Sequence, residues 1–120
     1  MKKLLYVIFI VLFVGSLSAA SAQGQIMSGK YNANTNSSGY TLDKGSGDRT
    51  YTVEVSYPTG FDKKPTVVAN VSTIDAEKTT NVRYSVEVTA VSRDGFIIKI
   101  TTWGDSKIYG IGGSWIAYSE

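Results

Sequence analysis

The chain has 120 residues with no cysteine and no histidine, and its 12 basic residues nearly balance its 10 acidic ones. Without histidine, the Ser/His/Asp and Cys/His catalytic arrangements and most zinc sites are excluded, and no phosphate-binding or calcium-binding loop motif points to a metal or a cofactor. Without cysteine, a small domain has to rely on its apolar core or on association with other chains.

Residues 1–22 have the organisation of a secretory signal peptide. Lys2 and Lys3 precede an apolar stretch over residues 4–14, and Ala20-Ser21-Ala22 forms a small-x-small cleavage signal. Cleavage there removes 22 of the 120 residues and leaves 98, enough for one domain of a secreted, extracellular protein without membrane insertion. It also removes two of the 12 basic residues, so that ten basic residues face ten acidic ones. A net charge near zero argues against nucleic acid or an anionic membrane as partner.

Residues 23–49 combine one weak strand signal with a long polar stretch. Residues 25–31 can form a first strand with Ile26 on one face. Residues 32–49 are rich in Asn, Ser and Gly and nearly devoid of apolar anchors, so they predict a loop. A loop of this length in a compact domain is usually functional or disordered.

Residues 50–120 contain a succession of strand signals and no helical pattern. Alternating or β-branched segments predict further strands over residues 51–57, 66–74, 82–91, 96–103 and 109–118. Asp94-Gly95 marks a tight hairpin turn. Together with the first strand, this pattern predicts an all-β fold, a six-stranded antiparallel β-sandwich.

Two tryptophans stand in the last quarter of the chain. The alternation of residues 96–103 places Phe96 on the apolar face and Trp103 on the polar face, beside a turn of Gly, Asp and Ser. Trp103 either packs beneath its own turn or offers its ring to a ligand. Trp115 lies in an apolar run with Ile116 and is predicted to be core.

Two other features also have alternative interpretations. Gly110, Gly112 and Gly113 in the last strand allow close approach of another backbone, such as that of a neighbouring subunit, or they mark a bulge. Glu54 and Glu87 would be a carboxylate pair for a glycosidase, but both fall on the polar side of their strands and are better explained as solvated residues. The sequence therefore predicts no catalytic residues and no enzyme.

A series of short segments stands in a defined order between residues 51 and 118. They are residues 67–74, Asn81-Val82-Arg83, Gly95-Phe96, Thr102-Trp103, Lys107-Ile108-Tyr109 and Ser114-Trp115-Ile116, with Met27-Ser28-Gly29-Lys30 as a first strand. In this order and spacing they resemble the H-type lectin domain of snail agglutinins and of the C-terminal part of discoidins. The resemblance implies a trimer of six-stranded sandwiches that binds galactose-type sugars, above all N-acetylgalactosamine, near the subunit interfaces. It divides the chain into a signal peptide (1–22), an N-terminal strand and polar loop (23–49) and a lectin-like sandwich (50–120).

The resemblance also assigns roles to three residues. Arg83 matches the arginine that hydrogen-bonds the sugar, and its guanidinium offers several fixed donors to hydroxyl oxygens. Trp103 and Tyr109 match the aromatic residues that line the site and cover the apolar face of a galactose-like ring. Considered alone, Arg83 would be a solvated strand residue paired with Asp75 or Asp105.

Two positions depart from the family pattern. Well-known members have a histidine after the tryptophan, where this chain has Gly104 followed by Asp105. Their acidic residue in the N-terminal loop aligns with Asn36 or Ser37, which bring no carboxylate. Asp105 is a candidate for supplying that carboxylate from the other side of the site.

Two functions follow from these patterns. The first is a secreted lectin without cofactor or metal, whose weak sites act together in a homotrimer, or in a hexamer of paired trimers, to agglutinate or adhere to glycan-coated cells. The alternative is a secreted trimeric interaction or structural protein that has lost sugar binding.

Overall fold

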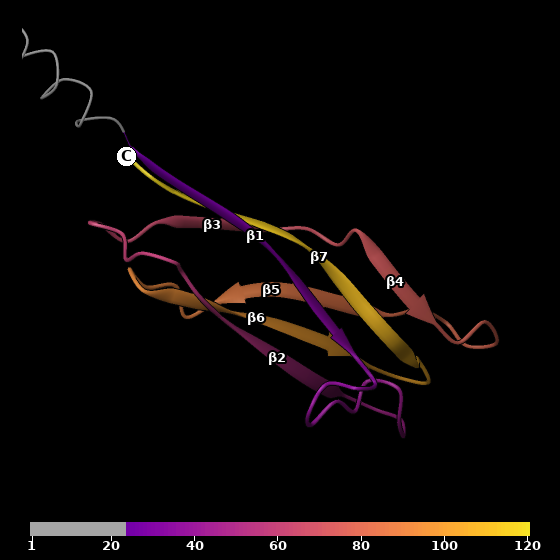
Figure 1. Cartoon of the computed structure of the whole chain (residues 1–120). Helices are drawn as coiled ribbons and strands as arrows, with labels where there is room; N and C mark the ends of the chain where they lie inside the picture. Colours follow the sequence, from indigo (N-terminus) through magenta and orange to yellow (C-terminus); the bar gives the residue numbers. More distant parts are fainter. Residues whose placement is uncertain (1–23) are drawn as a thin grey trace, which may run out of the picture.

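The computed structural model describes residues 24–120, and the expected signal peptide lies outside them. These residues form seven strands and no helix, and therefore none that could span a membrane. The strands pack as two antiparallel sheets facing each other, which confirms the predicted sandwich (Figure 1). Their bounds are β1 (Gln25–Asn34), β2 (Arg49–Ser56), β3 (Thr66–Ala69), β4 (Thr73–Ala76), β5 (Tyr84–Thr89), β6 (Gly95–Thr102) and β7 (Ile108–Ser119).

The first sheet is built around the long strand β7. One edge of β7 pairs with the full length of β1, from Gln25 opposite Ser119 to Asn34 opposite Gly110. The other edge pairs with β3 and then with β4. The weak strand signal near the amino terminus is therefore confirmed as an edge strand of the same sandwich.

The strand expected over residues 66–74 is divided into β3 and β4. Between them, the backbone N–H of Asn70 donates to the carbonyl of Ser114 (2.9 Å), while the Asn70 side-chain oxygen accepts from the Ser114 N–H (2.9 Å). The Asn70 carbonyl instead accepts from the hydroxyl of Tyr31 (2.7 Å). A Cβ on Gly113 would overlap that carbonyl. At this glycine, the close approach considered above comes from the chain itself.

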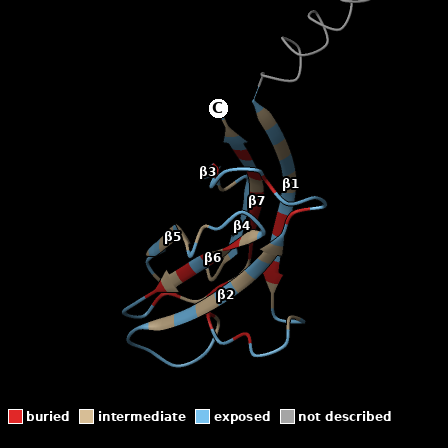
Figure 2. Cartoon of the chain, turned by 90° about the vertical axis from the view of Figure 1, so that its left-hand side faces the viewer, coloured by how far each residue is buried: buried red, intermediate tan, exposed pale blue. Residues whose placement is uncertain are grey.

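The second sheet has the order β2-β6-β5 and follows the predicted alternation. Val53 lies opposite Ile98 on β6, and Val88 lies opposite Ile98 from the other side. The side chains of Phe96, Ile98 and Ile100 are buried, so they supply this sheet's half of the core. Figure 2 shows buried segments in red on β1, β6 and β7, the strands that contribute many of the core residues.

Trp115 is buried, as predicted, and lies in an aromatic cluster of the core. Its ring packs edge-on against Phe96 with ring centroids 5.2 Å apart, and it also contacts Tyr57. The predicted loop contains two anchors that its polar composition concealed. Tyr40 and Leu42 are both buried in the core, so the expectation that residues 32–49 lack apolar anchors is wrong.

Candidate functional site

Four of the predicted site residues meet at the end of the sandwich where β6 leaves its sheet. Tyr84, at the start of β5, lies opposite Thr102, at the end of β6. The residue before Tyr84 and the residues after Thr102 are therefore neighbours in space. This pairing brings Arg83 to the turn formed by Trp103, Gly104 and Asp105; these four residues are called the Arg83 group below.

The charged side chains of the Arg83 group form an ion pair. Nη1 of Arg83 lies 2.8 Å from Oδ1 of Asp105, with the side chains 39% and 61% exposed. Of the two pairings considered from sequence, the one with Asp105 is confirmed. A pair this exposed contributes little to stability, about 0–1 kcal/mol. Its consequence is geometric, because it places donor N–H groups beside an acceptor carboxylate at the surface.

Gly104 is required by the shape of the turn. Its φ of +67° lies in the left-handed region, which side chains other than glycine rarely adopt. A Cβ there would also stand 3.3 Å from Nη1 of Arg83. A histidine at this position would strain the turn and crowd the guanidinium, so the departure from the family pattern matches the local backbone.

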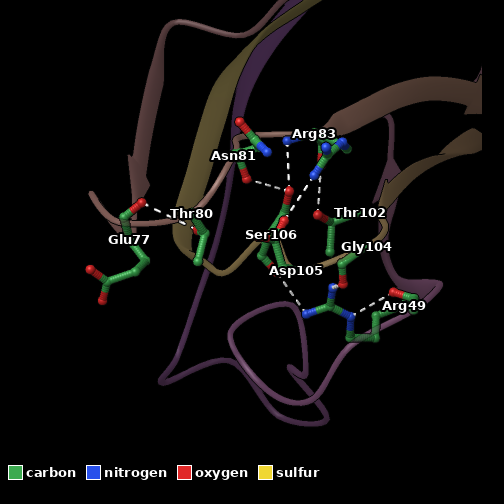
Figure 3. A network of polar contacts seen from close by, with 10 residues as sticks. Arg49, Glu77, Thr80, Asn81, Arg83, Thr102, Gly104, Asp105 and Ser106 are labelled. Atoms are coloured by element: carbon green, nitrogen blue, oxygen red, sulfur yellow. Dashed lines mark hydrogen bonds and ion pairs between the residues drawn. The ribbon is translucent and has the colours of Figure 1, made fainter.

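Two buried hydroxyl groups fix the backbone of Arg83 (Figure 3). The Oγ of Ser106 accepts from the Arg83 N–H (2.8 Å) and donates to the carbonyl of Asn81 (2.5 Å). The Oγ1 of Thr102 donates to the Arg83 carbonyl (2.6 Å). Sequence reasoning missed both residues, although each lies within one residue of the Trp-Gly-Asp turn. Buried and fully bonded, they make the position of Arg83 rigid.

The two tryptophans differ in exposure as the polar and apolar faces predict. Trp103 is 39% exposed, whereas Trp115 is 6% exposed. Among residues 24–120, the Trp103 ring takes part in no close aromatic pair. Of the two interpretations of Trp103, its exposure beside Arg83 favours a ring available to a ligand.

Tyr109, Asn36 and Ser37 belong to a second group at the same end of the molecule. The Tyr109 hydroxyl donates to Oε2 of Glu77 (2.7 Å), and the Tyr109 carbonyl accepts from the N–H of Thr35 (3.1 Å). Asn36 and Ser37 follow Thr35 in the same turn. The Oγ of Ser37 accepts a hydrogen bond from the backbone N–H of Asn34 (3.1 Å). No hydrogen bond or ion pair between described residues joins this group directly to Arg83.

Glu77 is an acidic residue that sequence reasoning did not select. The hydrogen bond from Tyr109 and then the backbone N–H of Thr79 lower the pKa of its carboxyl. The same bond raises the pKa of Tyr109. Near neutral pH the pair is therefore a phenol that donates to a carboxylate.

The polar loop that reaches the Arg83 group is the one just before β2. The N–H of Gly47 donates to the Gly104 carbonyl (3.0 Å), and Nη2 of Arg49 donates to the same oxygen (3.0 Å). Asp48 stands exposed between them. It is a second carboxylate near the turn, and its place in a Gly-Ser-Gly-Asp-Arg run was the signal that could have indicated it.

The other carboxylate pair considered from sequence does not form a site. Glu54 on β2 and Glu87 on β5 are both exposed, and β6 lies between their strands. Both have the solvated positions that their alternation predicted.

The model of the H-type lectin domain matches residues 52–118 of this chain. The chain belongs to the H-type lectin domain family. This H-type lectin is 33% identical over 73 residues to "ATP synthase subunits region ORF 7" of Fuscovulum blasticum, a match that covers 61% of this chain and 64% of that protein. It therefore spans less than two thirds of that relative.

Two solved structures share the fold of this H-type lectin. They are recombinant and wild-type discoidin II of Dictyostelium discoideum, each 21% identical with a TM-score of 0.72. Both matches cover 82% of this chain, and they cover 38% and 37% of the discoidin chains. These two structures show the fold that this chain shares with them.

Proposed function

We propose that this protein is a secreted lectin that binds terminal sugars of the galactose type, including N-acetylgalactosamine, at the Arg83 group. The observation that carries the proposal is the exposed ion pair of Arg83 and Asp105 beside the exposed ring of Trp103. A pyranose offers adjacent hydroxyl groups on its edge and an apolar C–H face. The group presents the matching donor and acceptor 2.8 Å apart, with the exposed flat ring two residues before Asp105 in the same turn.

Each residue of the group has a distinct task in this proposal. The guanidinium N–H groups of Arg83 that are not engaged by Asp105 donate to sugar hydroxyl oxygens. Asp105 accepts from a neighbouring hydroxyl and takes the place of the carboxylate that Asn36 and Ser37 do not bring. Trp103 covers the C–H face, and Gly104 leaves room for the sugar where a histidine would stand.

We further propose that copies of the chain associate through the outer face of the β1-β7-β3 sheet. Strand pairing places Ile26 beside Tyr118 and Val68 beside Ile116, and these four side chains are between 42% and 71% exposed. Contiguous exposed apolar side chains of this kind mark a surface that a partner covers.

The outer face of the other sheet provides the contrast within the same molecule. It carries mainly hydroxyl and charged side chains, such as those of Thr52, Glu54 and Lys99. Covering the apolar face with further copies agrees with the trimer that the family resemblance implies. In such a trimer, Tyr109, Asn36 and Ser37 would be the residues that extend a sugar site towards a subunit interface.

One observation favours the alternative of a trimeric interaction protein without sugar binding. Gly104 replaces a histidine that well-known family members place at the sugar, so a contact of the family pattern is missing. The alternative predicts a folded oligomer that binds no glycan, and it predicts that Arg83→Ala changes no binding activity.

A glycan array with the purified protein and its Arg83→Ala variant tests the proposal. We expect binding to a defined set of terminal galactose-type sugars, reduced about tenfold or more in the variant because a charged hydrogen-bond donor is lost. Arg93→Ala is the matched control, since Arg93 is exposed in the β5–β6 turn at the other end of β6. Size-exclusion chromatography should give the same oligomer for all three proteins. An intact oligomer that binds no glycan on the array would contradict the proposal.

A further inference from the structure

Arg49 uses its guanidinium to connect two loops. Nε donates to the carbonyl of Gly47 (2.9 Å) and Nη1 to that of Lys44 (2.9 Å), both in the loop before β2. Nη1 also donates to the carbonyl of Ser106 (2.8 Å) and Nη2 to that of Gly104 (3.0 Å), both in the turn after β6 (Figure 3). These four acceptors and a fifth, more distant one, the Leu42 carbonyl at 3.5 Å from Nη1, are all backbone carbonyls. The guanidinium therefore holds the backbone of the loops and not their side chains.

The position of these acceptors matters for the Arg83 group. Gly104 and Ser106 enclose Asp105, the partner of Arg83, on both sides in the chain. The Gly104 carbonyl accepts from Arg49 and also from the N–H of Gly47, so both of its lone pairs are engaged. The turn is otherwise held by the Asp105–Arg83 ion pair and by a long hydrogen bond from the Ser106 N–H to the Trp103 carbonyl (3.4 Å). Short exposed segments of this kind open locally at little cost.

We propose that Arg49 is a positioning residue of the lectin site: it holds the turn of Trp103 to Asp105 in its binding shape and fixes the loop that carries Asp48 beside it. It sets sugar affinity without touching the sugar. This inference rests on the function proposed above. A mobile turn would present Trp103, Asp105 and the paired guanidinium in many arrangements. Ordering them on sugar binding would cost conformational entropy and lower the affinity.

Sugar affinity and stability measured together separate positioning from a general structural role. In the full protein, Arg49→Gln keeps a polar but shorter side chain and loses the charge and the fork of donors, whereas Arg49→Lys keeps the charge alone. We expect the dissociation constant for free N-acetylgalactosamine or galactose to rise about fivefold or more in both variants, within the range for residues that act without ligand contact. Arg93→Gln is the control and should bind like the wild type.

Hydrogen exchange adds a measurement that does not depend on the sugar. The amides of residues 103–106 and 43–48 should exchange faster together in Arg49→Lys, while those of β6 and β7 keep their protection. If Arg49→Gln does not fold, Arg49→Lys and this exchange pattern decide the question.

The outcomes distinguish the inference from the function on which it rests. Folded Arg49 variants that bind the sugar within twofold of the wild type would overturn the positioning role and leave the lectin standing. A wild type that binds no sugar would overturn the lectin and the positioning role together. A loss of affinity that follows only the unfolded fraction, with unchanged exchange in both loops, would also overturn the positioning role.

Discussion

Tyr40 shows at the scale of a single residue how a polar loop becomes part of the core. Its hydroxyl donates to the carbonyl of Ile108 (2.6 Å), and its ring packs against Tyr51 with centroids 5.4 Å apart. Burial, followed by the charges of Asp43 and Asp75, raises the pKa of Tyr40 from 10.0 to about 12.

This pKa makes stability depend on alkaline pH. The folded state holds the phenolic proton more tightly than the unfolded chain does, so the stabilisation is complete below pH 10 and is lost as the pH rises towards 12. We expect the melting temperature to fall across this interval. Tyr40→Phe should be less stable at neutral pH by about 1 kcal/mol or more, because the Ile108 carbonyl loses its donor. The melting temperature of Tyr40→Phe should also fall less steeply above pH 10 than that of the wild type. Equal alkaline slopes in both proteins would show that Tyr40 is not the group responsible.

The same scale shows what sequence reasoning can find at a site. Strand alternation placed Trp103 on an exposed face, and the family pattern selected Arg83. Asp105 was predicted as a substitute for the carboxylate of the family pattern, and the structure brings it to Arg83. It did not select Ser106 or Arg49. Their partners include backbone groups between 23 and 57 positions away in the chain, and no periodic pattern predicts which of these groups a loop brings to them.

At the scale of elements, some features of the strands were predicted from the sequence and others were not. Residues of β2 alternate strictly and those of β6 nearly so. Their predicted faces are confirmed because both strands lie in one antiparallel sheet with one face towards the core. The break between β3 and β4 was not predicted. It depends on Asn70 replacing a ladder bond on β7, 44 positions away in the chain, so the local β-branched composition could not reveal it.

The crossing at Asn70 leads to a prediction about β7. Gly113→Ala places a methyl group against the Asn70 carbonyl, and backbone cannot retreat as a side chain can. We expect a loss of about 3 kcal/mol in the free energy of unfolding, at the upper end for an overpacked position. Gly110→Ala, in the same strand, has its nearest neighbour at 3.5 Å and serves as control. Urea denaturation of both variants checks this, and a Gly113→Ala protein as stable as Gly110→Ala would contradict it.

At the scale of the whole molecule, the two outer faces of the sandwich determine how it meets other copies. Ile116→Lys places a charge in the middle of the exposed apolar face, whereas Thr52→Lys places the same charge on the polar face. We expect Ile116→Lys to shift the protein to monomers in analytical ultracentrifugation, because burying an unpaired charge is costly. Its affinity for a free monosaccharide should stay within twofold of the wild type.

Binding to a glycan-coated surface should change far more in that variant. A monomer binds the surface through one site, whereas an oligomer binds through several sites at once. Surface binding should therefore be about a hundredfold or more weaker in the variant. Thr52→Lys should behave like the wild type in all three measurements. An Ile116→Lys protein that remains oligomeric would place the interface elsewhere.

The pairing of β1 with β7 brings Gln25 beside Ser119, at the opposite end of the sheet from the start of β7 and the Arg83 turn (Figure 1). A group attached at Glu120 would therefore stand on the side of the sandwich away from Trp103. A sensor or bead that holds the protein by its carboxyl terminus would present every Arg83 group outwards. The same orientation would let a biotin tag or fluorescent label be added at that terminus without obstructing the surface proposed to meet the sugar.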